Sequence, residues 1–149
     1  MQILTEGRRK DNIKKLFENV SFITFNYDRC IEHFLFHALQ NFFGIDANEA
    51  ASSIKMLNIF HPYGLVGYMP WQHVTGSTSF GNNIGGSTLL SRAGQIKTFT
   101  EQIKNEDTII EMRQLVQDAE IIVFLGFAFN RQNMELIKPT KPSNAKKVF

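Results

Sequence analysis

Polar residues follow three apolar, strand-like segments of this sequence. Asn26 and Asp28 follow the first segment, His61 and Gly64 the second, and Gly126 the third. Asparagine supplies a donor and an acceptor for hydroxyl groups, and a histidine can take a proton from a hydroxyl or from water near neutral pH. The carboxyl ends of parallel strands share the edge at which open α/β sheets bind ligands. The three ends together predict one polar ligand site.

Each of these residues also has a structural interpretation. Asn26 or Asp28 could cap the helix that follows, because both types are favoured at helix starts. His61 precedes Pro62 and could be a hydrogen-bonded turn residue, and Gly126 could serve only its turn. Their joint placement at three strand ends favours the functional interpretation.

The elements that would position these residues can be read from the spacing of apolar residues. The three strands are expected over 20–25, 55–60 and 120–125, and each is followed by a turn and helical residues. This order predicts an α/β fold with parallel strands. Gly44 is expected to end one helix and Asp46 to cap the next. Helices are expected over 8–18 (a short surface helix), 27–43, 47–54, 96–103, 109–119 and 131–137.

Composition favours one folded domain over residues 1–149. The chain has 43% apolar and 20% charged residues and a net charge of +2, which is too small to indicate a nucleic-acid partner. The stretch 76–94 is rich in Gly, Ser, Thr and Asn and predicts a flexible loop.

The single cysteine, Cys30, excludes an internal disulfide; it is expected to be a small buried residue, with a lowered thiol pKa as the alternative. No stretch has the roughly 20 apolar residues of a membrane span, so we expect a cytoplasmic protein.

Three motifs in order resemble the SIR2-like domains, which are relatives of the sirtuins. They are TFNYD (24–28), FHPYG (60–64) and FLGFAFNRQN (124–133), and the resemblance extends from about residue 20 to the C-terminus. It implies a Rossmann-like three-layer fold with a parallel sheet, and NAD as substrate or ligand. Asn26 would contact the nicotinamide ribose and Asp28 the carboxamide, while His61 would be the catalytic base or a ribose contact. The resemblance implies His61 and Asn26 as catalytic residues. The cofactor-binding residues that it implies are Thr24, Asn26, Asp28, Gly64, Gly126, Phe127 and Asn133.

Two departures from the family pattern shape the expected activity. The four-cysteine zinc module of sirtuin deacylases is replaced by the loop 76–94, so the resemblance is to the zinc-free NAD hydrolases of bacterial defence systems, with a role in anti-phage defence. The Gly-rich strand–loop–helix of the family should precede Val20, and the 19 residues there contain no such pattern. We therefore expect a fold that is incomplete at its N-terminal βα unit, with NAD hydrolysis in the complete form. The alternatives are an inactive remnant that acts as an interaction or oligomerisation module, and an NAD-dependent protein deacylase.

Two further patterns are set aside. His33 and His37 share one helix face but lack the glutamate of the zinc-protease motif and a third ligand, so no metal site is expected. Residues 76–81 have the glycine spacing of a P-loop, but Asn82 and Asn83 replace the residues that hold phosphate and magnesium.

Overall fold

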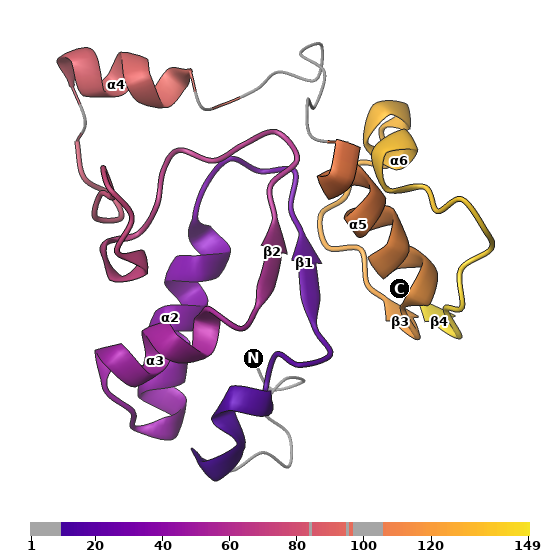
Figure 1. Ribbon diagram of the computed structural model, residues 1–149, viewed down its shortest axis with the longest axis horizontal. Coiled ribbons are helices and arrows are strands. Elements are labelled where there is room, and N and C mark those ends of the chain that lie inside the picture. Colours follow the sequence, from indigo (N-terminus) through magenta and orange to yellow (C-terminus); the bar gives the residue numbers. More distant parts are fainter. Residues whose placement is uncertain (1–9, 84, 95, 97–105) are drawn as a thin grey trace. The chain divides into compact units, whose positions relative to one another are not determined.

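The computed structural model describes residues 10–83, 85–94, 96 and 106–149. The chain divides into two compact units, Met1–Ile96 and Lys97–Phe149, and each is described by itself (Figure 1). A single domain over 1–149, as the sequence predicts, stays a prediction. Within the described residues, no helix has the length and apolar character needed to cross a membrane.

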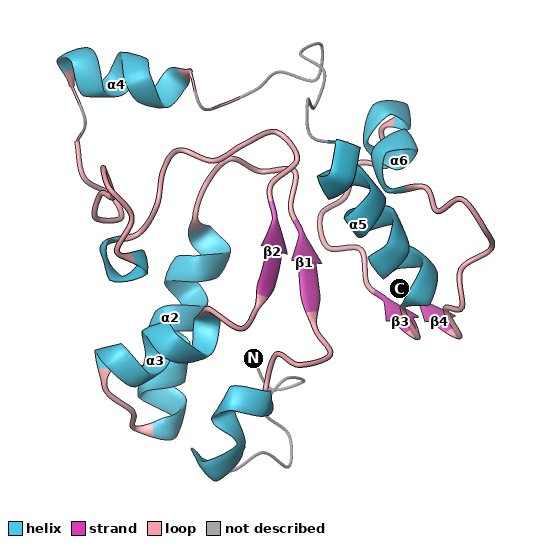
Figure 2. Ribbon diagram, in the orientation of Figure 1, coloured by secondary structure: helices cyan, strands magenta, loops and turns pink. Residues whose placement is uncertain are grey.

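The first unit is built on two short parallel strands beside a pair of helices (Figure 2). Strand β1 pairs with β2 in a register that places Phe22 opposite Ile59. Helix α2 follows β1, and α3 packs against α2 before the chain enters β2. The elements of this unit are the 3-10 helix η1 (Lys10–Lys15), β1 (Ser21–Ile23), α2 (Cys30–Phe43), α3 (Ala47–Ile54), β2 (Asn58–Phe60), the 3-10 helix η2 (Pro70–Gln72) and α4 (Gly86–Ala93).

Local signals set the boundary between α2 and α3. Gly44 ends α2 in the left-handed conformation with a φ of 61°, which favours glycine. The side chain of Asp46 accepts a hydrogen bond from the backbone N–H of Glu49 at 2.9 Å, so Asp46 caps α3 as expected. The start of α2 differs from the expectation, because the helix begins at Cys30 and not at residue 27.

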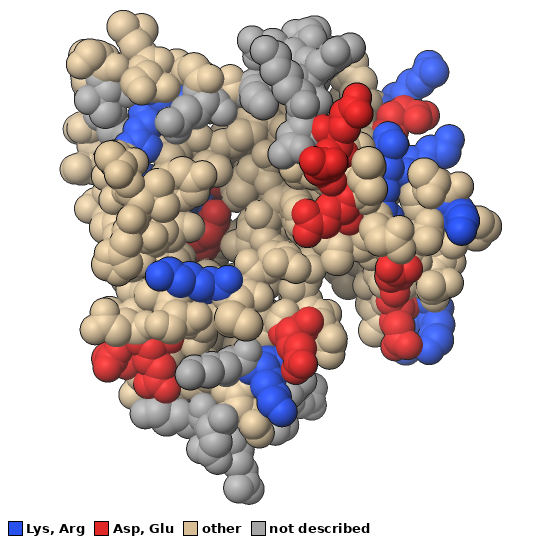
Figure 3. All heavy atoms as spheres, in the orientation of Figure 1, with Lys and Arg blue, Asp and Glu red and all other residues tan. Residues whose placement is uncertain are grey.

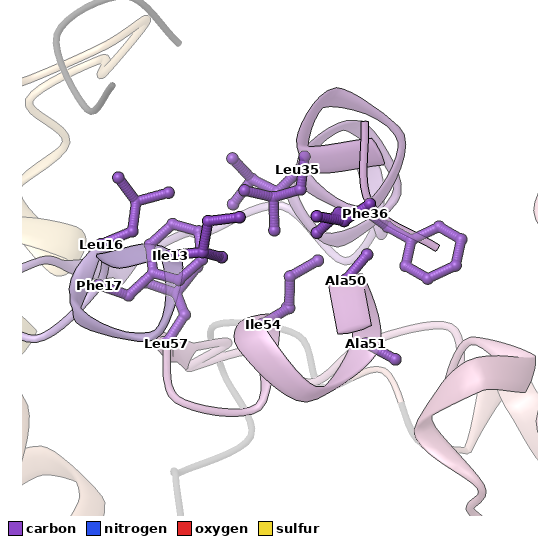
Figure 4. Packing of buried hydrophobic residues seen from close by; sticks show 11 residues of the cluster. Ile13, Leu16, Phe17, Leu35, Phe36, Ala50, Ala51, Ile54 and Leu57 are labelled. Carbon is purple, nitrogen blue, oxygen red and sulfur yellow. The ribbon is translucent and has the colours of Figure 1, made fainter. Parts of the chain in front are cut away.

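One apolar cluster holds the first unit together (Figure 4). Phe22 and Ile59, opposite each other in the sheet, pack against it, so one sheet face covers the core. The surface helix expected over 8–18 is not seen in its described part, residues 10–18, which form a 3-10 helix and a turn whose apolar side chains are buried in this cluster. The buried members are Ile13, Leu16, Phe17, Leu35, Phe36, Leu39, Ile45, Ala50, Ala51, Ile54 and Leu57.

The stretch 76–94 is not a loop throughout. Residues 86–93 form α4, which ends at Gly94, and Arg92 in this helix is buried. Glycine and serine are poor helix formers, and their abundance conceals this helix from the sequence. The loop expectation fits the described residues before α4.

The second unit contains two helices and two very short parallel strands. Helix α5 (Glu106–Asp118) packs on α6 (Arg131–Ile137), and both were expected. Strand β3 (Ile121–Ile122) pairs in parallel with β4 (Lys147–Val148), so the strand expected over 120–125 is shorter than predicted. The helix expected over 96–103 lies almost wholly outside the described residues. The protein is therefore a mixed helix and strand protein with small parallel sheets.

Candidate functional site

The ends of β1 and β2 lie together, as the sequence predicts. Beyond the strands, the Thr24 N–H donates to the Phe60 carbonyl at 2.9 Å, and the Val66 N–H donates to the Tyr27 carbonyl at 2.9 Å. The two chain segments therefore stay joined for several residues past the paired strands. This joined strand end brings residues 24–28 beside residues 60–66.

The side chain of His61 is buried at this joined strand end, and both of its ring nitrogens have hydrogen-bond partners. Its Nδ1 lies 3.1 Å from the Asn26 carbonyl oxygen, and its Nε2 lies 3.0 Å from Oε1 of Glu32. The two side chains of the His61–Glu32 pair are 6% and 7% exposed. Because a carbonyl oxygen only accepts hydrogen bonds, Nδ1 must carry the proton of its bond.

The pKa of His61 is raised above its ordinary value. Burial acts to lower this pKa, because it disfavours the charged ring. The hydrogen bond to Glu32 and the charge of Glu32 act in the opposite direction, with further support from the Asn26 carbonyl and the charge of Asp28. These interactions together outweigh burial and favour the imidazolium.

Glu32 and Arg29 each keep one buried polar atom without a partner in the described part of the chain. These atoms are Oε2 of Glu32 and Nε of Arg29. Glu32 is 5% exposed and Arg29 is 6% exposed. A buried donor or acceptor without a partner costs free energy, so each is a candidate contact for a ligand.

Asp28 satisfies the backbone at the start of α2, whereas Asn26 does not. The Asp28 carboxylate accepts a hydrogen bond at 2.9 Å from the N–H of Cys30, the first residue of α2, although the N-cap position itself is Arg29 and has no side-chain cap. Asn26 lies four residues before the helix and is exposed, so it is not the cap. Its N–H donates to Oγ1 of Thr24 at 3.3 Å, which occupies the Thr24 side chain locally.

Cys30 is neither buried nor activated. The side chain is exposed, which contradicts the expectation of a small buried residue. A hydrogen bond with Asp28, with smaller contributions from burial and from the charges of Asp28 and Glu32, raises the pKa of the thiol. A raised pKa disfavours the nucleophilic thiolate, so the alternative of a lowered pKa is also wrong.

Gly64 completes the turn after β2. Its N–H donates to the His61 carbonyl at 2.9 Å, and its φ is 80°. A positive φ of this size favours glycine, so Gly64 has a structural reason to be present. The turn holds the backbone of His61 and thereby supports the position of the ring.

Two buried arginines hold the segment that follows this turn. The guanidinium of Arg29 donates to the carbonyl oxygens of Tyr68, Thr78 and Ser79. Burial is the main cause that lowers the pKa of Arg29, and the charge of Arg92 adds to it while Glu32 opposes it. The carbonyl oxygens therefore supply much of the compensation that the buried cation needs.

Arg92 of α4 reaches the same segment from another direction. It donates to the Val66 carbonyl at 3.3 Å and to Oγ1 of Thr78 at 2.7 Å. A Cβ at Gly67 would lie 1.5 Å from Nη1 of Arg92, so only glycine leaves room for this guanidinium. The described part of the Gly/Ser-rich stretch is therefore held by side-chain hydrogen bonds.

The third predicted strand end lies in the second unit. Gly126 has a φ of 58°, and a Cβ there would meet nothing within 4 Å, so its φ alone calls for glycine. Phe127 contacts Phe124 and Phe129 with ring centroids 5.2 and 5.1 Å apart. Asn133 is half-buried in α6. These residues stay predicted cofactor contacts.

Sequence reasoning missed Glu32, Arg29 and Arg92. A signal existed for Glu32, because it shares the helical spacing of Leu35, Phe36 and Leu39, which form the buried stripe of α2. A carboxylate within such a stripe needs a buried partner, and His61 is that partner. The arginines gave no comparable signal, since their acceptors are backbone carbonyls.

Charge and metal-ligand geometry add little to this description. Basic and acidic side chains are both visible on the drawn face of each unit in Figure 3. Among the described residues, no group of three or more histidine, cysteine, aspartate or glutamate side chains could hold a metal ion. His33 stacks on Phe80 with centroids 4.0 Å apart and contacts His37 edge-on at 4.6 Å.

Comparisons of the chain with protein-family models, with curated proteins and with solved structures found no match. The residues at the joined strand end are therefore the basis for the function proposed below. They provide a buried histidine, an exposed asparagine beside it and two buried polar atoms without partners, a set suited to binding hydroxyl groups.

Proposed function

We propose that the chain is an NAD-binding SIR2-like domain that, in its complete form, hydrolyses NAD and releases nicotinamide. The observation that carries this proposal is the contact between Asn26 and His61 at the joined ends of β1 and β2, with His61 Nδ1 3.1 Å from the Asn26 carbonyl. The proposal includes a larger Rossmann-like parallel sheet of which β1 and β2 are two strands.

Cleavage of the nicotinamide–ribose bond builds positive charge at the anomeric carbon, so the site must orient the ribose hydroxyls and direct water. The exposed Asn26 side chain would donate to and accept from a hydroxyl. His61 would take a proton at Nε2, since its Nδ1 proton is held by the Asn26 carbonyl. Oε2 of Glu32 and Nε of Arg29 fit such a ligand because both are buried without partners in the described residues.

The remaining cofactor contacts are proposed from the sequence resemblance. Asp28 would reach the carboxamide through its carboxylate. Thr24 and Gly64 would shape the same edge. Gly126, Phe127 and Asn133 belong to the second unit, and they stay cofactor contacts that the resemblance alone implies.

The test is to incubate the full chain with NAD and to quantify both binding and nicotinamide. We expect binding, and we expect His61→Ala to lower any nicotinamide release at least about 100-fold, as loss of a general base does. Asn26→Ala should weaken both. The matched controls are Asn41→Ala and His37→Ala, which change exposed residues of α2. Absence of both binding and release in the unaltered chain would contradict the proposal.

A second candidate is an interaction or oligomerisation module without catalytic activity. Apolar side chains of the second unit favour it, because Leu125, Val148 and Phe149 are 82%, 60% and 68% exposed. Exposed apolar patches commonly mark interaction sites. Light scattering tests this candidate: a concentration-dependent rise in mass is expected, and a strict monomer at all concentrations would contradict it.

A further inference from the structure

The proposed function uses one oxygen of the buried Glu32 carboxylate, Oε2, as a ligand contact but gives no role to the other oxygen, Oε1. It is the partner of His61 Nε2, the nitrogen that a reacting hydroxyl would need. We propose that Glu32 is a positioning residue that holds the His61 ring and occupies Nε2 as an ion pair, and that a ligand hydroxyl reaches Nε2 only when this carboxylate yields. This inference rests on the proposed function.

The hydrogen-bond partners of the His61 ring favour one protonation state of the resting pair. Nδ1 donates to the Asn26 carbonyl, and Nε2 faces a carboxylate oxygen at 3.0 Å. A carboxylate accepts hydrogen bonds, so a proton on Nε2 completes both bonds and makes the ring an imidazolium. In this form His61 has no lone pair to accept a proton from a hydroxyl.

The charges around the pair act in the same direction on His61. Glu32 and Asp28 both favour the imidazolium, while burial opposes it. On the other side, Glu32 interacts with the cation of Arg29, whose Nε is buried and has no partner in the described residues. Arg29 lies three residues before Glu32, so this N–H is a ready donor for a carboxylate that leaves His61.

The pair therefore changes state with pH. Below the raised pKa the imidazolium holds Glu32. Above it the Nε2 proton passes to solvent, and the Nε2 lone pair then faces a carboxylate, which is repulsive. The carboxylate leaves Nε2, and a hydroxyl can donate its proton there while Nδ1 keeps its own proton.

The test uses NMR of the full chain labelled with ¹⁵N. At neutral pH, both ring nitrogens of His61 should show the shifts of a protonated imidazolium, and His61 should titrate above the ordinary histidine value of about 6.5. In Glu32→Gln the amide can still donate to Nε2, so the ring keeps its place without the negative charge. The His61 titration should then fall by about one pH unit or more.

The matched control is Glu49→Gln, which removes an exposed carboxylate of α3 and should leave the His61 titration unchanged. A neutral His61 ring at pH 7 in the unaltered chain, or an equal titration in the unaltered chain and Glu32→Gln, would overturn the inference. The first of these readings needs no variant and so does not depend on the variant folding.

Nicotinamide release separates this inference from the proposed function. Where release occurs, the acidic limb of its pH profile should move to lower pH in Glu32→Gln by the shift that NMR measures. An unmoved limb would overturn the positioning role. No binding and no release, together with an imidazolium at His61, would contradict the proposed function and also the role of Glu32 in it, while the ion pair itself would stand.

Discussion

The ends of β2 and β3 carry similar sequences, a short apolar strand followed by a turn with glycine, yet their surroundings differ. After β2, His61 is buried and bonded at both ring nitrogens. After β3, Gly126 is exposed and the neighbouring aromatic rings of Phe124, Phe127 and Phe129 contact mainly one another. The first end is held by polar contacts between segments distant in sequence, and the second by local aromatic contacts.

The difference follows from the core beneath each end. Among the described residues of the first unit, eleven buried apolar residues form one cluster, and the His61 and Glu32 side chains are buried as well, so the interactions between their charges are strong. In the described part of the second unit, Met112 and Ile137 are the buried apolar residues. The raised pKa of His61 makes the first end the better candidate for chemistry.

The largest effect should come from the core of the first unit. Leu39 is fully buried, so Leu39→Ala should lower the free energy of unfolding by about 3 kcal/mol through lost burial and a cavity. Denaturant unfolding followed by fluorescence of Trp71, the single tryptophan, reports on this unit. Leu125→Ala at the exposed end of β3, followed by amide hydrogen exchange of α5 and α6 in the second unit, should change stability by less than about 0.5 kcal/mol. Equal losses would remove the contrast between the two units.

Loss of the Arg29 guanidinium should have the next largest effect. Arg29→Met removes the donors to the carbonyl oxygens of Tyr68, Thr78 and Ser79, at a cost of about 2 kcal/mol. Hydrogen exchange should become faster over residues 66–79. Lys55→Met, which removes an exposed cation of the same unit, is the control and should change neither quantity. Unchanged exchange in Arg29→Met would show that the arginine does not hold this segment.

The stability of the first unit should depend on the charge of His61. Because folding raises the pKa of His61, its stabilising contribution is complete below the ordinary value of about 6.5 and is lost as the pH rises through the raised value. The stability difference between the unaltered chain and His61→Gln should therefore shrink from pH 6 to pH 9. Taking this difference cancels the contribution of His33. Burial lowers the pKa of His33, and the charges of His37 and Arg29 lower it further. A difference that grows with pH would reverse the sign and contradict the ion pair.

The smallest effect is expected at the end of β3, in the second unit. Gly126→Ala places a Cβ in open space but at a φ of 58°, so it should destabilise the second unit by about 1 kcal/mol through backbone strain alone. Amide hydrogen exchange of α5 and α6 measures this change. A neutral or stabilising result would show that the backbone at this turn can readjust.

The elements that the sequence predicted well have local signals. The bounds of α3 follow from Gly44 and Asp46, and α6 starts after Asn130, whose side chain accepts from the Gln132 N–H at 2.9 Å. The ends of β1 and β2 were also predicted to meet, because parallel pairing leaves their carboxyl ends at one edge. These features depend on residues near one another or on topology.

The features that the sequence did not predict depend on distant contacts. The Glu32–His61 pair joins residues 29 apart in the sequence, and Arg29 finds its acceptors 39 to 50 residues away. The late start of α2 has a similar cause, because the Asn26 carbonyl bonds to His61 rather than to a helix N–H. Helix α4 was not predicted because its residues have weak helix propensity. The helix expected over 96–103 stays a prediction, since residues 97–105 lie outside the described residues.

The most direct test of the central claim is a titration of the ¹⁵N-labelled chain with NAD. We expect the chemical shifts of the His61 ring and of the Asn26 side-chain amide to change together and saturate, while the shift of the exposed Asn41 side-chain amide stays unchanged. Absence of any saturable shift at His61 and Asn26, with the chain folded, would contradict the assignment of the joined strand end as an NAD site.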